Sequence, residues 1–378
     1  MDFAAAIFGL VLIVLVLWEG FETVVLPRRG TRRFRFTRFF FRRTWRLWVR
    51  MVDTLIPAHR RETWLSVFGP LSLLLLLSVW ALGLITGFAL IHWACGSAVL
   101  THDGTADFLT DLYLSGTTFF TLGPGDIALR SNLARALVVS ESGMGFAFLA
   151  LVIGYFPALN QSFARREVSI SLLDARAGSP PTASEMLRRH GHDRGMEALR
   201  QLLHEWELWS AGFLEGHLSY PVLAFFRSQH NNQSWLGALT SILDTCALIM
   251  AGLEGPCARQ AELTFAMTRH AVVDLSLVFK TIPLEPATPR LTPEKLVELR
   301  TLLAGSGLVL HEGEAFDRKL TELRELYEPY VNAMAAFFGI AVPPWIAEES
   351  WVDNWQSSVW DRHSHGRLTG GKSGNGHF

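Results

Sequence analysis

Apolar residues are concentrated in the first 160 positions of the chain, in three stretches long enough to cross a membrane as helices. These stretches cover residues 3–26, 64–93 and 133–156, and a helical span of the hydrocarbon core needs about 20 residues. The first stretch has no basic segment before it, and Glu19 and Glu22 lie near its end. We therefore interpret it as a retained helix rather than a cleaved secretory signal, and we expect three transmembrane helices.

Arginine is concentrated between the first two apolar stretches. Twelve arginines but only one acid, Asp53, occur from Arg28 to Arg61. Such a cluster stays on the cytoplasmic side of the membrane. The N-terminus is then outside, the second helix runs outward and the third returns. We expect a multi-pass protein of the inner (plasma) membrane, with the residues after the third helix in the cytoplasm.

The basic segment itself, residues 28–62, has two interpretations. Several arginines recur at every third position, as in a voltage-sensing helix, which needs neighbouring helices to shelter its charge. On a helical projection, however, seven arginines share one arc, and Phe34, Phe41, Trp45 and Trp48 lie opposite. This pattern is typical of a helix that lies in the membrane interface. Because a single membrane helix precedes the segment, we favour the interfacial helix.

The stretch between the second and third apolar segments is too short to cross the membrane twice as helices. Residues 108–120 continue as an amphipathic half-helix that Thr105 or Asp107 can cap. Thr117 and Thr118 lead into the run Thr121-Leu122-Gly123-Pro124-Gly125-Asp126. We expect a re-entrant loop in which a helix enters the membrane and an extended segment returns.

The composition of this run suits the dehydration of a cation, which requires oxygen atoms in place of its water shell. Consecutive carbonyls point to one axis only if alternate residues adopt left-handed dihedral angles, and Gly123 and Gly125 do so without steric cost. Asp126 adds negative charge at the outer mouth. The expected ion sites are the carbonyls of Thr121, Leu122, Gly123 and Pro124, with the Thr121 hydroxyl. The alternative is an external turn, because Gly-Pro-Gly is a common turn composition.

The same run resembles the filter of the potassium-channel family, whose signature reads T-x-x-T-V-G-Y-G-D. The match falls on Thr118, Thr121, Gly123, Gly125 and Asp126. The resemblance implies passive conduction of K⁺, with no cofactor besides the permeant ion. It also implies a pore-helix support made by Tyr113, Thr117 and Thr118, with Tyr113 bracing the filter aspartate.

Two positions depart from the signature. Leu122 replaces a β-branched residue, and Pro124 replaces an aromatic residue. Proline removes a backbone N–H, and the substitution also removes the ring that packs behind the filter in the family. The sequence is therefore compatible with a weakly selective monovalent-cation channel as well as with a potassium channel.

The third apolar stretch contains residues with two readings each. Gly143 and Gly145 suit a gating hinge, because glycine weakens a helix by about 1 kcal/mol relative to alanine. The alternative is that they allow close packing between membrane helices. Glu141 is an ionisable residue within a membrane helix and so a functional candidate, or it faces water at the pore wall. Gly154 and Pro157 suit a constriction or the end of the helix.

One re-entrant loop cannot enclose an axis, so the resemblance implies a homotetramer embedded in lipid. The fold class expected is an all-α membrane protein with three transmembrane helices, a re-entrant pore loop and a mainly helical cytoplasmic domain. The expected divisions are residues 1–27 (first helix), 28–62 (basic segment), 63–162 (pore domain), 163–365 (helical cytoplasmic domain) and 366–378 (disordered tail).

The second half of the chain shows no recognised regulatory motif. Amphipathic patterns predict helices over residues 184–209, 235–253, 257–281, 293–304 and 314–339. A metal site among His204, Glu205, Glu207, His217, His230 and Asp244, or a catalytic set of Ser210, His217 and Asp244, lacks support from spacing. The near-neutral charge of −1 argues against nucleic-acid binding. We do not expect an enzyme. The second half of the chain is expected to be a gating domain with an unknown cytoplasmic ligand, or the whole protein is a membrane-anchored sensor or scaffold.

Overall fold

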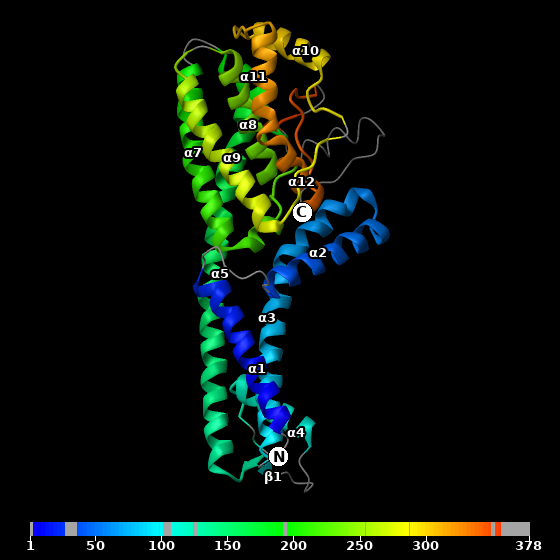
Figure 1. Cartoon of the computed structure of the whole chain (residues 1–378), viewed down its shortest axis with the longest axis vertical. Helices are drawn as coiled ribbons and strands as arrows, with labels where there is room; N and C mark the ends of the chain where they lie inside the picture. The colour runs from blue at the N-terminus through cyan, green and yellow to red at the C-terminus, as the bar shows by residue number, and fades with distance from the viewer. Residues whose placement is uncertain are drawn as a thin grey trace. The chain divides into compact units, whose positions relative to one another are not determined.

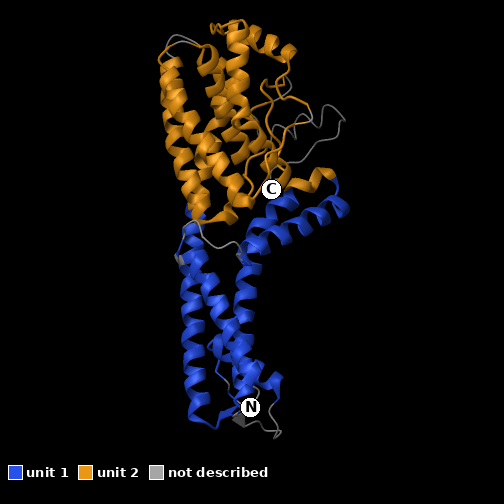
Figure 2. Ribbon diagram, viewed as in Figure 1, with its two compact units in different colours: residues 1–57, 63–161 blue, residues 58–62, 162–378 orange. Residues whose placement is uncertain are grey.

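The computed structural model is mainly helical and divides into two compact units (Figure 2). Unit 1 comprises residues 1–57 and 63–161, and unit 2 comprises residues 58–62 and 162–378. The structure describes residues 3–26, 36–97, 99–100, 107–123, 125, 127–191, 195–253, 255–286, 288–348 and 352–356. The predicted tail, residues 366–378, and the start of the basic segment, residues 28–35, lie outside the described residues.

Unit 1 contains the three long apolar helices expected from the sequence and, between the second and the third, the short helix α4 (Figure 1). Its elements are α1 (Phe3–Gly20), the π-helix η1 (Phe21–Val25), α2 (Phe36–Leu55), α3 (Arg61–Ala94), β1 (Val99–Leu100), α4 (Phe108–Phe119), β2 (Ala128–Leu129) and the first part of α5 (Asn132–Ala177). A 3₁₀ turn, η2 (Ala58–Arg60), precedes α3. Aliphatic and aromatic side chains of α1, α3, α4 and α5 meet in one core.

Unit 2 is a helical bundle in which α7, α8 and α9 lie side by side (Figure 1). After the end of α5, its elements are α6 (Ala183–His190), α7 (Gly195–Ser219), η3 (Pro221–Phe225), α8 (Trp235–Gly252), α9 (Ala258–Phe279), α10 (Pro293–Ala304), α11 (Glu314–Glu325), α12 (Glu328–Phe338) and η4 (Asn354–Gln356). A buried ion network fastens the bundle: Asp244 accepts from Arg290 and from the Tyr327 hydroxyl, each at 2.5 Å.

Four helices in the described residues are long and apolar enough to cross a membrane: Phe3–Val24, Ala58–Ala94, Asn132–Ala177 and Trp235–Gly252. The first three correspond to the stretches expected from the sequence. The fourth, α8, is mostly apolar but includes the paired Asp244, and 89% of it is buried inside the protein. A helix that is hydrophobic all round is a core helix or a membrane span, and the burial of α8 among its neighbours favours the core of unit 2.

The third membrane helix is much longer than the sequence pattern indicates. We expected it to end near residue 156, with Pro157 as a possible stop, but α5 continues through Pro157 to Ala177. The prediction that the helix ends near Pro157 is therefore wrong. Beyond the proline, Ile170, Leu173 and Ala177 are buried, so burial of one face in unit 2 holds the chain helical where the apolar pattern has ended.

The arginine-rich helix α2 buries its aromatic face against α3. Trp45 is buried, with its ring centroid 4.9 Å from that of Phe68. The indole N–H of Trp48 donates to the carbonyl of Trp64 at 3.0 Å. The carboxylate of Glu19 accepts from the first backbone N–H groups of α2, with the Phe36 N–H at 3.0 Å, where a negative charge favours a helix start. The aromatic face expected to enter the membrane interface is therefore partly a protein contact.

Helices α1 and α3 approach closely at small residues that the sequence analysis did not single out. A Cβ added to Gly9 would lie 2.6 Å from the carbonyl oxygen of Gly87, and one added to Gly87 would lie 2.6 Å from Ile13. Gly83 similarly faces Val16. Gly83 and Gly87 form a G-x-x-x-G pattern, which permits close packing of membrane helices.

We expect Gly87→Ala to separate α1 from α3, because its methyl group has no space at the crossing. Overpacking of this kind destabilises by about 1–3 kcal/mol, which would appear as a lower Tm of the detergent-solubilised protein. The matched control is Gly20→Ala at the end of α1, where nothing lies within 4 Å of an added Cβ. Equal melting temperatures for the two variants would contradict the crossing.

A buried histidine in unit 2 makes the stability of this unit depend on pH. His217 stacks on Phe213, with ring centroids 4.0 Å apart, and its Nδ1 lies 2.8 Å from the Phe213 carbonyl. Burial, and then the nearby positive charge of Arg166, lower the pKa of His217 from 6.5 to about 3. The folded protein thus keeps His217 neutral at pH values at which the unfolded chain binds a proton.

Because the folded pKa is depressed, His217 lowers the free energy of unfolding as the pH falls below 6.5. Between pH 7 and pH 5 the expected loss is about 2 kcal/mol. We predict that His217→Gln removes this part of the acid destabilisation seen in thermal unfolding, whatever its effect at pH 7. His204→Gln, which changes an exposed histidine of the same helix, should leave it in place. An unchanged acid dependence in His217→Gln would refute the assignment.

Candidate ion-conduction site

The helix α4 begins at a capping box within the re-entrant loop. The backbone N–H of Thr110 donates to the Asp107 carboxylate at 2.8 Å, and the N–H of Asp107 donates to the Thr110 hydroxyl oxygen at 3.4 Å. The sequence left Thr105 and Asp107 as possible caps. The structure confirms Asp107, and Thr105 lies outside the described residues.

The end of α4 is closed by two backbone hydrogen bonds that turn the chain into residues 121–126, the segment predicted to form the filter (the filter segment). The N–H of Leu122 donates to the carbonyl of Thr117 at 2.8 Å, and the N–H of Thr121 donates to that of Thr118 at 2.9 Å. This pair is the Schellman pattern, which requires a left-handed residue after the helix. Thr121 has this conformation, with φ of 57°. A β-branched residue is strained there, and strain of this kind, of about 1–3 kcal/mol, gathers at functional sites.

Residues 121–123 of the filter segment present carbonyl oxygens that have no partner in the described part of the chain. Thr121 and Gly123 both have positive φ, at 57° and 80°, with Leu122 between them. Left-handed residues thus alternate at Thr121 and Gly123, whereas Gly125 has no positive φ, so the prediction that Gly123 and Gly125 are the alternating left-handed pair is wrong. Among the described residues, no hydrogen bond is accepted by the carbonyls of Thr121, Leu122 or Gly123. Gly125 is exposed, and Pro124 and Asp126 lie outside the described residues.

A short antiparallel ladder joins the two ends of the re-entrant loop. Val99 pairs with Leu129, and Leu100 pairs with Ala128. Beneath the ladder, Leu114 of α4 packs against Ile127 in a small hydrophobic cluster. The chain that leaves the filter is therefore held beside the chain that enters the loop.

The inner helix α5 approaches the end of α4 at one of its two central glycines. A Cβ added to Gly145 would lie 1.9 Å from the carbonyl oxygen of Phe119, whereas one added to Gly143 would meet nothing within 4 Å. Close packing therefore accounts for Gly145. Gly143 has no such contact in this chain, and α5 is continuously helical through both positions.

The three pore-helix residues expected to support the filter have different surroundings. Thr117 donates its hydroxyl to the carbonyls of Tyr113 and Leu114 within α4. Thr118 is buried, and its hydroxyl has no partner among the described residues. The Tyr113 side chain is 52% exposed on the single chain, and the aspartate it was expected to brace, Asp126, is outside the described residues.

Sequence reasoning singled out Glu141 but overlooked its partners behind α4. Of its two interpretations, exposure to water is wrong for this chain, because Glu141 is fully buried, beside His92 of α3 and Ser115 of α4. Asp111 is also buried and accepts from the Ser97 hydroxyl at 2.5 Å. Polar and ionisable residues inside or beside apolar stretches were the available signal.

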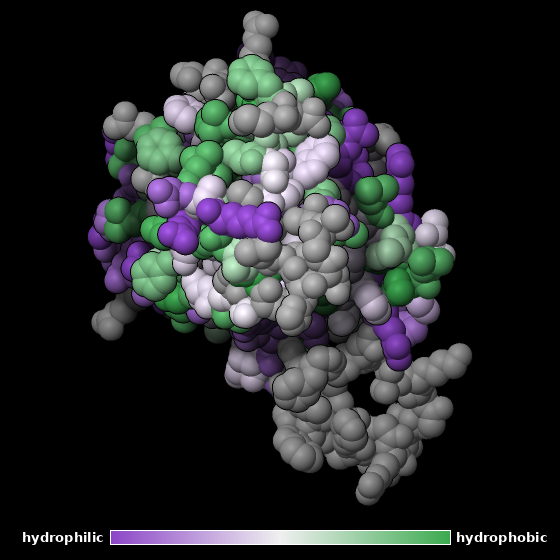
Figure 3. Space-filling model, turned by 90° about the horizontal axis from the view of Figure 1, so that it is seen from below, coloured by the Kyte–Doolittle hydropathy of each residue, from purple (hydrophilic) through white to green (hydrophobic). Residues whose placement is uncertain are grey.

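Large apolar side chains remain exposed on the single chain around this site. Leu122 in the filter segment is 75% exposed. Exposed residues on the first half of α5 are Leu133, Val139, Phe146, Leu149 and Ile153. Figure 3 shows hydrophobic residues at the surface among hydrophilic ones on the face that is in view. Lipid or further protein must cover such a surface.

The other candidate sites from the sequence do not come together in unit 2. Asp244 pairs with Arg290, and the Ser210 hydroxyl lies 3.0 Å from that of Thr268. No group of three or more possible metal ligands occurs within the described ranges.

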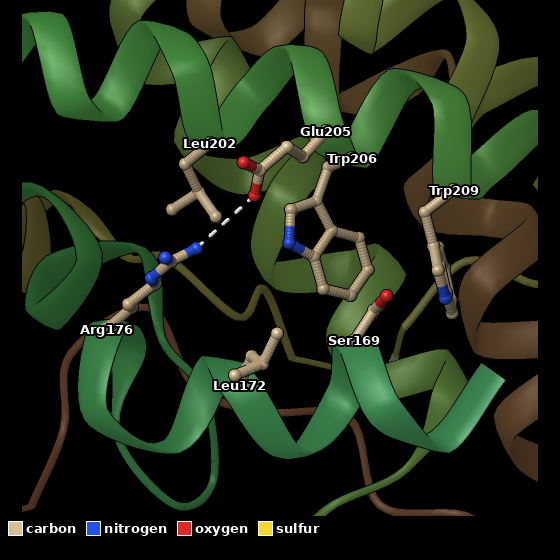
Figure 4. Close-up of a pocket in the computed structure, with 7 residues that line it drawn as sticks. All are labelled: Ser169, Leu172, Arg176, Leu202, Glu205, Trp206 and Trp209. Atoms are coloured by element: carbon tan, nitrogen blue, oxygen red, sulfur yellow. Dashed lines mark hydrogen bonds and ion pairs between the residues drawn. The ribbon is translucent and has the colours of Figure 1, made fainter. Parts of the chain in front are cut away.

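A hollow between α5 and α7 is crossed by the ion pair of Arg176 and Glu205 at 3.5 Å (Figure 4). Both charges are largely exposed, so this pair adds little stability.

Comparison with known proteins agrees with this geometry. Residues 77–161 match the family described as "Ion channel". The chain is also 23% identical over 197 residues to the uncharacterized membrane protein YdjJ of Bacillus subtilis (strain 168). That match covers 50% of this chain and 55% of the relative, so the chain spans about half the length of that protein. No solved structure matches the chain.

Together, the candidate spans and the membrane-protein relative identify a multi-pass membrane protein. The matched family consists of channels, not enzymes. Residues 77–161, which run from within α3 through α4 and the filter segment into α5, are an ion-channel domain of the potassium-channel pore family.

Proposed function

We propose that four copies of this chain form a pore that conducts K⁺ passively across the membrane. The observation that carries the proposal is the segment after α4, where Thr121 and Gly123 are left-handed and three successive carbonyls lack a hydrogen-bond partner in the described chain. Backbone oxygens of this kind can replace the water shell of a cation. The proposed ion ligands are the carbonyls of residues 121–124 and the Thr121 hydroxyl, with Asp126 at the mouth.

Exposure of the inner helix supports a closed ring of chains. In the most apolar part of α5 only 11% is buried, compared with 50% in α3. A single chain contributes one filter segment, and enclosing an axis in the manner of the family requires four. Neighbouring copies would cover the exposed Leu122 and Tyr113 side chains and the apolar face of α5.

The proposed orientation places the N-terminus outside and unit 2 in the cytoplasm. It rests on the arginines of residues 28–61, which favour the cytoplasmic side. Of these, Arg43, Arg46 and Arg50 are exposed on α2, where they can meet lipid headgroups. In this orientation the filter lies near the outer surface, and unit 2 can act on the inner end of α5.

A second candidate function is a weakly selective monovalent-cation channel. The specific observation that favours it is Pro124, which stands where the family has an aromatic residue that packs behind the filter. Conduction needs only the oxygens of the filter, whereas selectivity also depends on how firmly they are held. A membrane-anchored scaffold remains the third reading and predicts no flux.

Ion flux in proteoliposomes tests the proposal. With K⁺ inside, Na⁺ outside and valinomycin as positive control, we expect a K⁺ diffusion potential. Gly123→Ala should reduce the flux to background, because a side chain is strained at φ of 80°. Gly116→Ala, at an uncrowded glycine of α4, should keep it. Flux without a potential would favour the weakly selective pore, and equal flux in the two variants would contradict the filter assignment.

The two central glycines of α5 are proposed to have different roles. We assign the gating bend to Gly143, and we assign to Gly145 the contact with the Phe119 carbonyl at the end of α4. Gly143→Ala stiffens the helix by about 1 kcal/mol and should lower the open probability several-fold at an unchanged K⁺/Na⁺ permeability ratio. Gly145→Ala should displace α4 and alter the ratio. Single-channel recording in planar bilayers separates the two effects, and identical behaviour of the variants would reject the assignment.

A further inference from the structure

Three polar side chains from three different helices meet in the interior of unit 1. They are His92 of α3, Ser115 of α4 and Glu141 of α5, with 2%, 0% and 0% of their surfaces exposed. His92 Nε2 lies 3.7 Å from Glu141 Oε2, and the Ser115 hydroxyl donates to the same oxygen at 3.4 Å. The carboxylate thus connects the outer helix, the pore helix and the inner helix.

This cluster is costly to bury, so its presence requires an explanation. Within the described part of the chain, Glu141 Oε1 and His92 Nε2 have no hydrogen-bond partner. Ionisable side chains within membrane helices are expensive and usually functional. A plain packing contact between the three helices would need no ionisable group.

Few other titratable groups act on the pair. On α4, Asp111 interacts electrostatically with His92 and is itself bonded to Ser97, and Asp107 caps the helix start. On α5, Arg135 lies about two turns before Glu141 and is exposed, and the half-buried Cys95 directly follows the end of α3. His102, Asp103 and Asp126 are outside the described residues.

We propose that His92 and Glu141 hold a single proton between them and, through Ser115, brace the pore helix in its conducting position. This inference rests on the proposed channel function and deepens it, because it makes conduction depend on the protonation of residues that never touch the ion. His92, Ser115 and Glu141 are therefore positioning residues for the filter.

The physical reason is that one proton leaves the site without net charge. A second proton leaves an imidazolium beside a neutral acid, and loss of the shared proton leaves a carboxylate beside a neutral imidazole. In both cases one charge stays unpaired in a site that water does not reach, which is strongly unfavourable. The helices then separate to hydrate the charge, and α4 loses its brace. Two coupled groups of this kind produce a bell-shaped response to pH.

The first test is K⁺ flux in proteoliposomes equilibrated from about pH 5 to about pH 9, which spans the free histidine value. We expect a bell-shaped profile for the wild type that falls about tenfold per pH unit on each limb. Glu141→Gln keeps the shape and the hydrogen bonds but has no acid to ionise, so its profile should lose the alkaline limb and keep the acid limb. His92→Gln has no imidazole to protonate, so its profile should lose the acid limb and keep the alkaline limb. The matched control is His270→Gln, which removes a histidine paired with Asp274 at 3.5 Å in unit 2. This variant should keep the bell-shaped dependence of K⁺ flux on pH.

The second test does not depend on conduction. The difference in Tm between the wild type and Glu141→Gln, measured in detergent across the same pH range, should be largest near the flux optimum and shrink on both sides. Subtraction removes the contributions of other titrating groups, including His217. A wild-type profile that is flat, or that Glu141→Gln and His92→Gln reproduce, would overturn the brace. Absence of flux at every pH would overturn the channel function instead, and a constant Tm difference would then overturn the brace as well.

Discussion

In the proposed pore α4 ends inside the membrane, where its last carbonyls find no water, and the structure of unit 1 depends on how α4 meets this constraint. Water is absent at that depth, so each unpaired group costs several kcal/mol unless protein or a bound ion replaces it. The Schellman bonds at Thr121 and Leu122 satisfy two carbonyls of α4. The strained left-handed threonine is the conformational cost of this ending. It turns the next carbonyls away from the helix, and these are the groups proposed to bind the cation.

The same constraint explains why the pore helix is held from so many sides. The Asp107 capping box fixes its start, Ser97 holds Asp111 one turn later, and Gly145 lets α5 come against the Phe119 carbonyl. Each contact removes freedom from a short helix of 12 residues, which would not be stable alone. A filter built on free carbonyls needs such support. Oxygens that can move inward would also coordinate a smaller ion, and the filter would then lose selectivity.

Much of this arrangement could be predicted from the sequence, and the limits have physical causes. Long apolar stretches predicted the first three candidate membrane helices, and the polar residues before residue 108 predicted the start of α4 with Asp107 as one of two possible caps, because these are local signals. The continuation of α5 beyond Pro157 was missed, since burial in unit 2 decides it and not local hydropathy. The crossing at Gly83 and Gly87 and the partners of Glu141 were missed because both require knowing which helix lies opposite.

The division of the chain between the two units bears on gating. Unit 2 contains residues 162–177 at the end of α5 and also residues 58–62 at the start of α3. Within it, Glu62 lies 3.8 Å from Arg227, and Arg166 donates to the carbonyls of Leu223 and Phe226 at 2.8 Å. Both attachments lead to the short segment around η3, from residue 221 to 227. A change in the bundle that moves this segment would therefore act on the beginning of the outer helix and the end of the inner helix together. In the proposed channel, this segment is the route by which unit 2 would act on a bend of α5 at Gly143.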